Sequence, residues 1–396
     1  MTATNPLVSI PISPPDITEL EVKAAISALK DGYRLPGQEC ARFEELFQDF
    51  YETRFAIGVN SGTAGMHLCL RVSGITPGDM VITTPFSEIS CTHAVLYEKA
   101  IPVFVDIEPE TGAMDMEMLE QVVHDLLSSN KLARRWLPRR GTEGIGKLKV
   151  ILPVDTFGIP LNMEVPNGLA KEFNLKTIEE ASGAFGARFS DQRAGTCGNF
   201  GVFSFHSGSQ LSACNGGMIV TNDETATHFI RILRNEGSDP KLQNRLYSHL
   251  GYDYQLNELN SALGRAQLTR MEDVLRNRER AAQWYSTRLS GLPGIEVPFV
   301  PSNVKSVSWP VYAIRLASSI DRQRIIEELA IQGILSSAYH SPIHLQPFMV
   351  ERFGYRPGDF PAAESMVRSV LTLPYSGSMT EKQVDLICRS IKQILS

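Results

Sequence analysis

Short apolar runs rich in β-branched residues alternate with helical patterns between about residues 55 and 223. The intervening segments are amphipathic, as in Ala64–Val72, Met116–Leu127 and Met163–Phe173. Such alternation predicts an α/β fold, in which helices cover both faces of a mainly parallel seven-stranded sheet and form three layers. The expected strands are Phe55–Val59, Met80–Thr84, Pro102–Ile107, Val150–Asp155, Thr177–Glu180, Phe200–Phe205 and Met218–Thr221.

The pattern becomes helical after Thr221, and Glu258 to about Leu289 has continuous helical spacing. This helix is expected to lead into a smaller α+β unit with a strand near Val311–Leu316 and helices near Asp321–Gln332 and Thr380–Leu395. We therefore predict a boundary between residues 250 and 275. The expected parts are an N-terminal arm and helix (1–35), a large domain (36–260) and a small C-terminal domain (261–396).

Composition excludes several classes of protein. A net charge of −6 gives no reason to expect nucleic acid as a partner, and no apolar run is long enough to cross a membrane. Six scattered cysteines without a C-x-x-C pair argue against zinc or a disulfide framework, so no metal site is expected. The N-terminus lacks the features of a signal peptide, which predicts a cytoplasmic protein.

One stretch is strongly basic. Residues 131–149 carry seven basic residues and one acid. Charge runs of this kind are usually solvated surface, and the alternative is a site for an anionic ligand or an acidic partner.

Five segments together carry a family resemblance. The first, NSGTAGMHLCL, is a turn opening a helix, whose backbone N–H groups and Thr63 hydroxyl could approach a phosphate. It is followed by TPGDMVITTPFS, IPVFVDIEPETG, GNFGVFSFH with NGGMIVTND, and a C-terminal group of HSPIHLQPF, GYRPGDFPAAE and LTLPYSGSMTEKQVD. In order and spacing these segments resemble the DegT/StrS family of sugar aminotransferases, which have the fold of type I pyridoxal-phosphate enzymes.

The resemblance implies a homodimer with active sites at the subunit interface and a keto-sugar substrate linked to a nucleotide. It also implies a lysine three residues after His206 that holds the cofactor as a Schiff base. Ser209 stands there, and no lysine occurs between Lys176 and Lys241. Because a hydroxyl cannot form a Schiff base, a covalently held cofactor is not expected, and non-covalent pyridoxal or pyridoxamine phosphate remains open.

Other positions implied by the family also differ. Glu180 replaces the aspartate beside the pyridine nitrogen, and Glu88 replaces the aromatic ring that stacks on the cofactor. In the segment that reaches the neighbouring subunit's phosphate, Asp253 would repel a phosphate and Gln255 removes a positive charge. Gly62, Thr63 and Ser204 remain as part of a phosphate or substrate site.

These departures suggest acid–base chemistry by Glu88, Glu180, His206, Asp253 and Ser209, since crowded acids raise one another's pKa. They predict a pyridoxal-independent biosynthetic enzyme, of lyase or isomerase type, that dehydrates, isomerises or cyclises a small carbonyl or sugar-like substrate. The alternatives are a non-catalytic subunit paired with an active paralogue and a pyridoxamine-phosphate-dependent sugar dehydratase. Each of these residues could equally be a charge filling a solvated cleft.

Four further residues have weaker expectations. His340 and His344 are expected to be structural, and Cys214 to be a small buried residue. Arg188 and Arg193, which follow Glu180, are weaker candidates for contact with a substrate anion.

Overall fold

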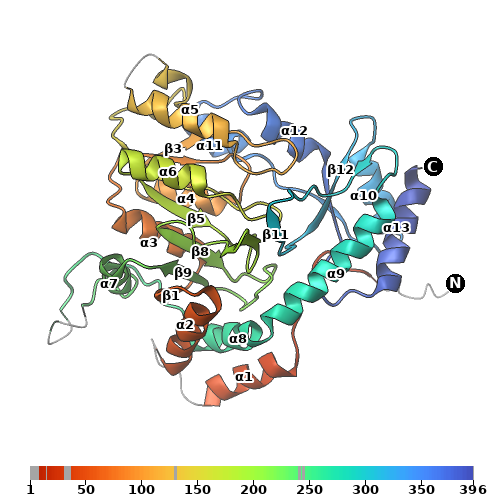
Figure 1. The fold of residues 1–396 in the computed structure, drawn as a ribbon, viewed down its shortest axis with the longest axis horizontal. Helices are drawn as coiled ribbons and strands as arrows, with labels where there is room; N and C mark the ends of the chain where they lie inside the picture. The colour runs from red at the N-terminus through yellow and green to blue at the C-terminus, as the bar shows by residue number, and fades with distance from the viewer. Residues whose placement is uncertain are drawn as a thin grey trace.

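The main sheet of the computed structural model has seven strands, in the order β1-β9-β8-β5-β4-β2-β3 (Figure 1). The structure describes residues 9–14, 16–30, 37–128, 132–239, 242 and 246–395. The neighbours from β8 to β3 pair in parallel, and β9 runs antiparallel to both β1 and β8. The predicted α/β class and mainly parallel seven-stranded sheet are confirmed. The strands are β1 Phe55–Val59, β2 Met80–Thr83, β3 Ile101–Phe104, β4 Leu148–Ile151, β5 Lys176–Glu180, β8 Phe200–Ser204 and β9 Gly217–Thr221.

Alternate residues along each strand supply two different cores. Val81 and Val202 belong to the cluster under α3, α4 and α7, whereas Ile82 and Phe203 face α5, α6 and α2. Period-two alternation with both faces apolar is what a sheet buried between two helical layers requires. The helices are α2 Gln38–Tyr51, α3 Gly62–Val72, α4 Ile89–Tyr97, α5 Met116–Leu127, α6 Glu164–Phe173 and α7 Glu224–Leu233, and η1 Ala133–Arg135 is a short 3-10 turn.

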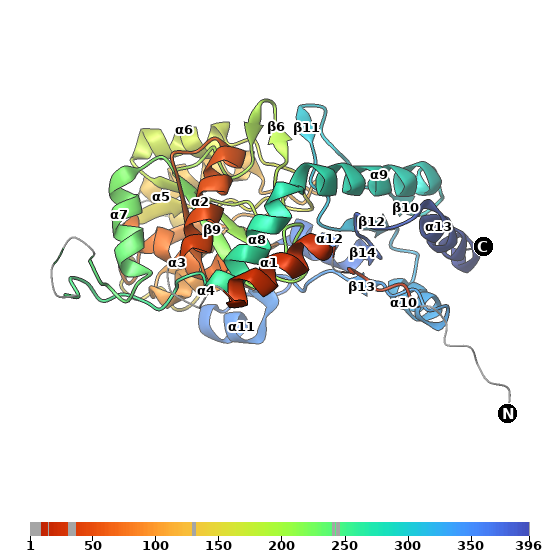
Figure 2. The same cartoon turned by 90° about the horizontal axis from the view of Figure 1, so that it is seen from below.

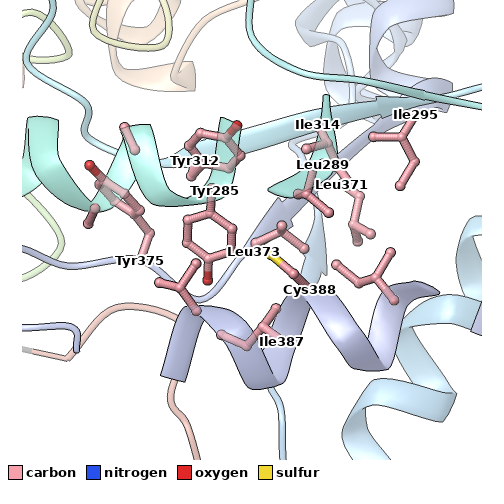
Figure 3. Close-up of a cluster of buried hydrophobic side chains, with 14 of the residues drawn as sticks. Tyr285, Leu289, Ile295, Tyr312, Ile314, Leu371, Leu373, Tyr375, Ile387 and Cys388 are labelled. Carbon is pink, nitrogen blue, oxygen red and sulfur yellow. The ribbon is translucent and has the colours of Figure 1, made fainter. Parts of the chain in front are cut away.

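A second sheet, of order β10-β12-β14-β13, forms the core of the C-terminal part. Tyr285 of the long helix α9 stacks on Tyr312 of β12 with ring centroids 4.7 Å apart, and Ile387 of α13 closes the cluster (Figure 3). These elements are α9 Met271–Leu289, β10 Ile295–Glu296, β12 Tyr312–Leu316, α10 Arg322–Ile331, β13 Ser337–Ala338, η3 Ile343–Leu345, α11 Pro347–Phe353, α12 Pro361–Ser369, β14 Val370–Leu373 and α13 Glu381–Leu395.

The expected helix from Glu258 to Leu289 is broken in two. It consists of α8 (Glu258–Thr269) and α9, separated at Arg270 with φ −116° and ψ 15°. The Arg270 side chain is held by Asp16 and by Glu21, which is fully buried, so tertiary ion pairs fix the break that helical spacing did not indicate. The break lies inside the predicted boundary interval of 250–275, and the division of the chain at residue 260 stays a prediction.

The N-terminal segment contacts both parts of the chain. Ile10 bridges Ile334, the Tyr375 N–H donates to the Ile12 carbonyl, and α1 (Glu19–Lys30) packs along α8 (Figure 2). Within the predicted arm of residues 1–35, positions 1–8, 15 and 31–35 lie outside the described residues.

A small three-stranded sheet also joins the two parts. It pairs β6 (Arg188–Phe189) with β7 (Gln192–Arg193) and with β11 (Val304–Ser306), which comes after α9 (Figure 2). No helix among the described residues is long and apolar enough to span a bilayer.

Candidate active site

A cavity of about 580 Å³ opens where the parallel strands of the main sheet end. In sheets of this type, ligands bind at the carboxyl ends of the strands. Seven of the eight predicted site residues line this cavity, although they come from four separate segments of the chain. They are Gly62, Thr63, Glu88, Glu180, Ser204, His206 and Ser209.

One end of the cavity is formed by the N-terminus of α3. Ser61 caps the helix by accepting from the Ala64 N–H at 3.1 Å, which leaves the first backbone N–H groups without partners inside the helix. A side chain at Gly62 would place its Cβ 2.8 Å from the Cβ of Ser204. The absence of that atom lets the helix end and the end of β8 approach each other, and both can donate to an anion there.

The floor of the cavity carries Glu180, at the end of β5. Its side chain is 8% exposed, and the Ser182 N–H donates to Oε1 at 3.3 Å. Burial, with smaller contributions from the charges of Glu88 and Glu179, raises the pKa of Glu180 to about 7. No cation is paired with this carboxyl among the residues that the structure describes, so a positively charged ligand atom would be stabilised beside it.

Asp155 lies next to Glu180 and is almost completely buried. Its Oδ1 accepts from the Leu161 N–H, whereas Oδ2 has no donor to accept from within the described ranges. Burial and the neighbouring Glu179 raise the pKa of Asp155 well above its ordinary value. Glu179 accepts the Gly195 N–H at 2.7 Å, which favours its charged form, so the proton shared by the two acids belongs on Asp155.

The segment after β8 places His206, Ser209 and Gln210 on one wall. Nδ1 of His206 accepts from the Gly208 N–H at 3.0 Å, so the neutral ring carries its hydrogen on Nε2, which can donate it in a hydrogen bond to a ligand. The Gln210 amide donates to the Gly183 carbonyl at 2.7 Å and fixes the base of the loop. No lysine or arginine lines the cavity among the described residues.

Glu88 and His340 meet across the mouth of the cavity. Oε1 of Glu88 lies 2.7 Å from Nε2 of His340, and each side chain remains more than half exposed. His340 lowers the pKa of Glu88, and Glu88 raises the pKa of His340, so the pairing favours the charged form of each group. His340 was expected to be structural and instead faces the site, which no sequence signal indicated.

Asp253 does not line this cavity. It is exposed, and its backbone carbonyl accepts from the Asn60 side chain at 2.9 Å. Gln255 of the same segment donates to Asn235. Within one chain, the predicted cooperation between Asp253 and the other acids therefore does not occur.

The remaining candidates lie elsewhere. Arg188 donates to the Asp191 carbonyl and Arg193 to Glu272, both away from the cavity. The expectation for Cys214 was wrong, because this residue is exposed, in a loop at φ 64°. His344 is fully buried and pairs with Glu364 at 3.1 Å.

Three basic side chains of the segment 131–149 are paired with acids. The partners are Arg135 with Asp125, Arg139 with Asp359, and Lys149 with Asp79. These ion pairs agree with the expectation of a surface segment, whereas Lys131 lies outside the described residues.

Comparison with known proteins gives consistent results along nearly the whole chain. A model of the DegT/DnrJ/EryC1/StrS aminotransferase family matches residues 15–392. The GDP-perosamine synthase of Caulobacter vibrioides is 31% identical, over 91% of this chain and 91% of that protein. Among solved structures, DesV of S. venezuelae in complex with a ketimine intermediate has a TM-score of 0.82 at 29% identity, covering 94% of this chain and 93% of that one. The PLP form of Spr1654 from Streptococcus pneumoniae, a putative sugar aminotransferase, has a TM-score of 0.85 at 24% identity over 98% of each chain and supports the fold alone.

These findings correct the function predicted from the sequence. A pyridoxal-independent lyase or isomerase was expected, with a partner subunit or a sugar dehydratase as alternatives. The matching family model describes aminotransferases, and the similar proteins with informative names include a perosamine synthase. The prediction of a non-transaminase function was wrong because it gave the substitutions around the cavity more weight than the similarity of the entire chain.

Proposed function

Because this chain belongs to the DegT/DnrJ/EryC1/StrS aminotransferase family, we propose that it transfers an amino group to a sugar-like carbonyl substrate, using a pyridoxal-type cofactor held without a covalent bond. One observation carries the proposal: the cavity combines an anion site at α3 with a buried carboxyl at Glu180 and contains no lysine within the described residues.

The residues present fit such a cofactor at two points. Gly62, Thr63 and Ser204 would hold its phosphate, since the end of α3 supplies partnerless N–H donors and the positive end of a helix dipole. Glu180 would pair with the protonated ring nitrogen, which would compensate a carboxyl whose pKa burial raises to about 7.

The lack of a lysine at the expected position is the reason why we propose that the cofactor is bound without a covalent bond. The resemblance of the segment GNFGVFSFH implies that Ser209 stands where the family has its lysine, and a hydroxyl cannot replace an amine in a Schiff base. When bound, the cofactor in its amine form supplies the nitrogen and the electron pair that the carbonyl substrate receives. The protein then needs to orient both molecules and move protons.

His206 is our candidate for orienting the substrate carbonyl, because Nδ1 accepts from the Gly208 N–H and the neutral ring therefore presents an Nε2–H that would donate a hydrogen bond. Ser209 would donate or accept a hydrogen bond on the same wall of the cavity. Asp155, neutral beside Glu179, would keep excess negative charge away from Glu180. Glu88 is a poorer candidate for proton transfer, because its ion pair with His340 stabilises the charged carboxylate.

We further propose a homodimer in which Asp253 approaches the partner's cavity. Asp253 is exposed, and α1 presents exposed apolar side chains that include Leu20, Ile26 and Leu29. Apolar surface of this kind is typical of interfaces.

The proposal is tested by a single turnover. The full-length protein is loaded with pyridoxamine phosphate, freed of excess cofactor and mixed with a panel of nucleotide-linked 3-keto- and 4-keto-hexoses. We expect one of these to be converted to an amino sugar, detected by mass spectrometry, in an amount limited by the bound cofactor, and His206→Asn to slow the conversion. Formation of no amino sugar from any member of the panel would overturn the proposed function.

A further inference from the structure

The ion pair at the mouth of the cavity joins segments that are far apart in the sequence. Glu88 directly precedes α4 in the main-sheet part, and His340 follows β13 in the C-terminal part. Glu88 occupies the N-cap position of α4 but makes no side-chain capping bond. The local fold therefore does not account for its carboxylate.

Each side chain of the pair has one polar atom that remains available to a ligand. Glu88 Oε1 and His340 Nε2 bond to each other at 2.7 Å, whereas Glu88 Oε2 and His340 Nδ1 have no partner among the described residues. The side chains are 57% and 58% exposed and line the cavity. A carboxylate oxygen that accepts and an imidazolium N–H that donates are thus presented together to a ligand.

Three aromatic rings lie beside this pair. Phe157 and Tyr339 are partly exposed at the cavity, and Phe86, which is only 2% exposed, supports them, with centroids 5.0 to 5.6 Å from one another. The flat C–H face of a pyranose ring is apolar, whereas its edge carries hydroxyl groups. A wall of aromatic rings next to a charged donor–acceptor pair matches both surfaces of a sugar ring.

The charged side chains around the cavity further limit the chemical class of ligand that it can bind. No lysine or arginine lines it within the described residues, and its anion site lies at α3. The end near Glu88 and His340 is consequently suited to a neutral, polyhydroxylated group rather than to a phosphate.

We propose that Glu88 and His340, with the aromatic wall of Phe86, Phe157 and Tyr339, form the subsite that binds the hydroxyl groups of the sugar ring. This inference rests on the proposed function for the presence of a sugar substrate. The inference identifies the residues that would select the sugar. One of them, Glu88, stands at a position where the family resemblance implies an aromatic ring.

Binding measurements on the full-length protein loaded with pyridoxamine phosphate test the subsite. The probes are UDP-glucose, dTDP-glucose and GDP-mannose, each compared by calorimetry with its free nucleotide. For the probe that binds best, we expect Glu88→Gln and His340→Gln each to weaken binding by about tenfold or more, because a hydrogen bond to a charged group is lost. Binding of the free nucleotide should be unchanged.

Sugar analogues that each lack one hydroxyl group distinguish direct recognition of that hydroxyl by Glu88 from a purely structural role of Glu88. If Glu88 binds a particular hydroxyl, Glu88→Gln should have little effect on the deoxy-sugar that lacks it. Asp191→Asn, which removes an exposed ion pair with Lys305 outside the cavity, is the matched control and should change nothing.

Three results would overturn the subsite: no binding of any nucleotide sugar, equal losses for the sugar and the free nucleotide, or equal losses for every deoxy analogue. Failure of the proposed function is distinguishable, because nucleotide-sugar binding that depends on the pair would persist without amino transfer.

Discussion

Ser209 and Glu180 are the residues that we propose to determine how a pyridoxal-type cofactor is held in this chain. The identity of Ser209 could be read directly from the sequence, as could the lack of a nearby lysine. The raised pKa of Glu180 could not, because it follows from burial at the end of β5 and from the nearby charges of Glu88 and Glu179, both of which depend on the assembled sheet. Spacing along the chain also gave no sign that Glu88 and His340 would meet.

Ser209→Lys should restore a covalent link to the cofactor. If position 209 faces the cofactor's reacting carbon, the introduced amine will form a Schiff base with pyridoxal phosphate that borohydride reduction makes permanent. Peptide mass mapping after reduction is the measurement. Ser207→Lys, on the same loop but outside the cavity lining, is the control. Equal labelling of the two variants would contradict the placement of Ser209.

Glu180 should make the stability of the cofactor-free protein depend on pH. Its folded-state pKa of about 7 lies above the ordinary value of 4.5, so the folded state binds the proton more tightly. The free energy of unfolding should therefore fall as pH rises from 4.5 through 7, by up to about 3 kcal/mol.

Glu180→Gln should reduce this fall without abolishing it, because burial also raises the pKa of Glu179 to about 7, and should stabilise the cofactor-free protein at pH 8 in denaturant titrations. The exposed Glu351→Gln serves as a control and should leave the pH profile unchanged. A Glu180→Gln profile identical to that of the unsubstituted protein would show that Glu180 is not desolvated as described.

The strands and the helices around them were the most predictable elements. Apolar runs identified all seven strands of the main sheet, because burial on both faces leaves a continuous apolar signal. Helical spacing missed the break at Arg270, since the ion pairs to Asp16 and Glu21 come from a segment more than two hundred residues away. The close approach of α3 to β8 at Gly62 was likewise not predictable from the sequence, because it depends on how the two elements pack in the folded chain.

Gly62→Ala should weaken phosphate binding at the N-terminus of α3. The added Cβ would lie 2.8 Å from the Cβ of Ser204, so the helix end must move away from β8. We expect the affinity for pyridoxamine phosphate to fall by about tenfold and the free energy of unfolding by about 1–3 kcal/mol.

Gly168→Ala is the matched control, because its Cβ would meet no atom within 4 Å in α6. It should leave the affinity unchanged and stabilise the helix by about 0.5–1 kcal/mol. Unchanged cofactor affinity in Gly62→Ala would contradict the assignment of this helix end as the phosphate site.

For the whole molecule, the similarity to known proteins decided the reaction class that the cavity residues left open. Substitutions at the cavity suggested a different chemistry, whereas the match over residues 15–392 supports an aminotransferase. Assembly is the property that a single chain leaves as a proposal, since Asp253 does not line the cavity of its own chain.

A Leu20→Glu, Leu29→Glu double variant should shift the protein from dimer to monomer in sedimentation velocity, because it places charges on the exposed apolar face of α1. Ile331→Glu is the control, since Ile331 of α10 is 75% exposed on another element. A dimer that persists in the double variant would place the interface elsewhere, and a monomeric unsubstituted protein would exclude the homodimer.

Cofactor binding tests the central claim most directly. The unsubstituted protein is titrated with pyridoxamine phosphate and with pyridoxal phosphate while absorption is recorded, and the complex with pyridoxal phosphate is then reduced with borohydride and weighed by mass spectrometry. We predict saturable binding of one cofactor per chain and no covalent adduct after reduction. Absence of saturable binding, or a cofactor that remains covalently attached after reduction, would contradict the account.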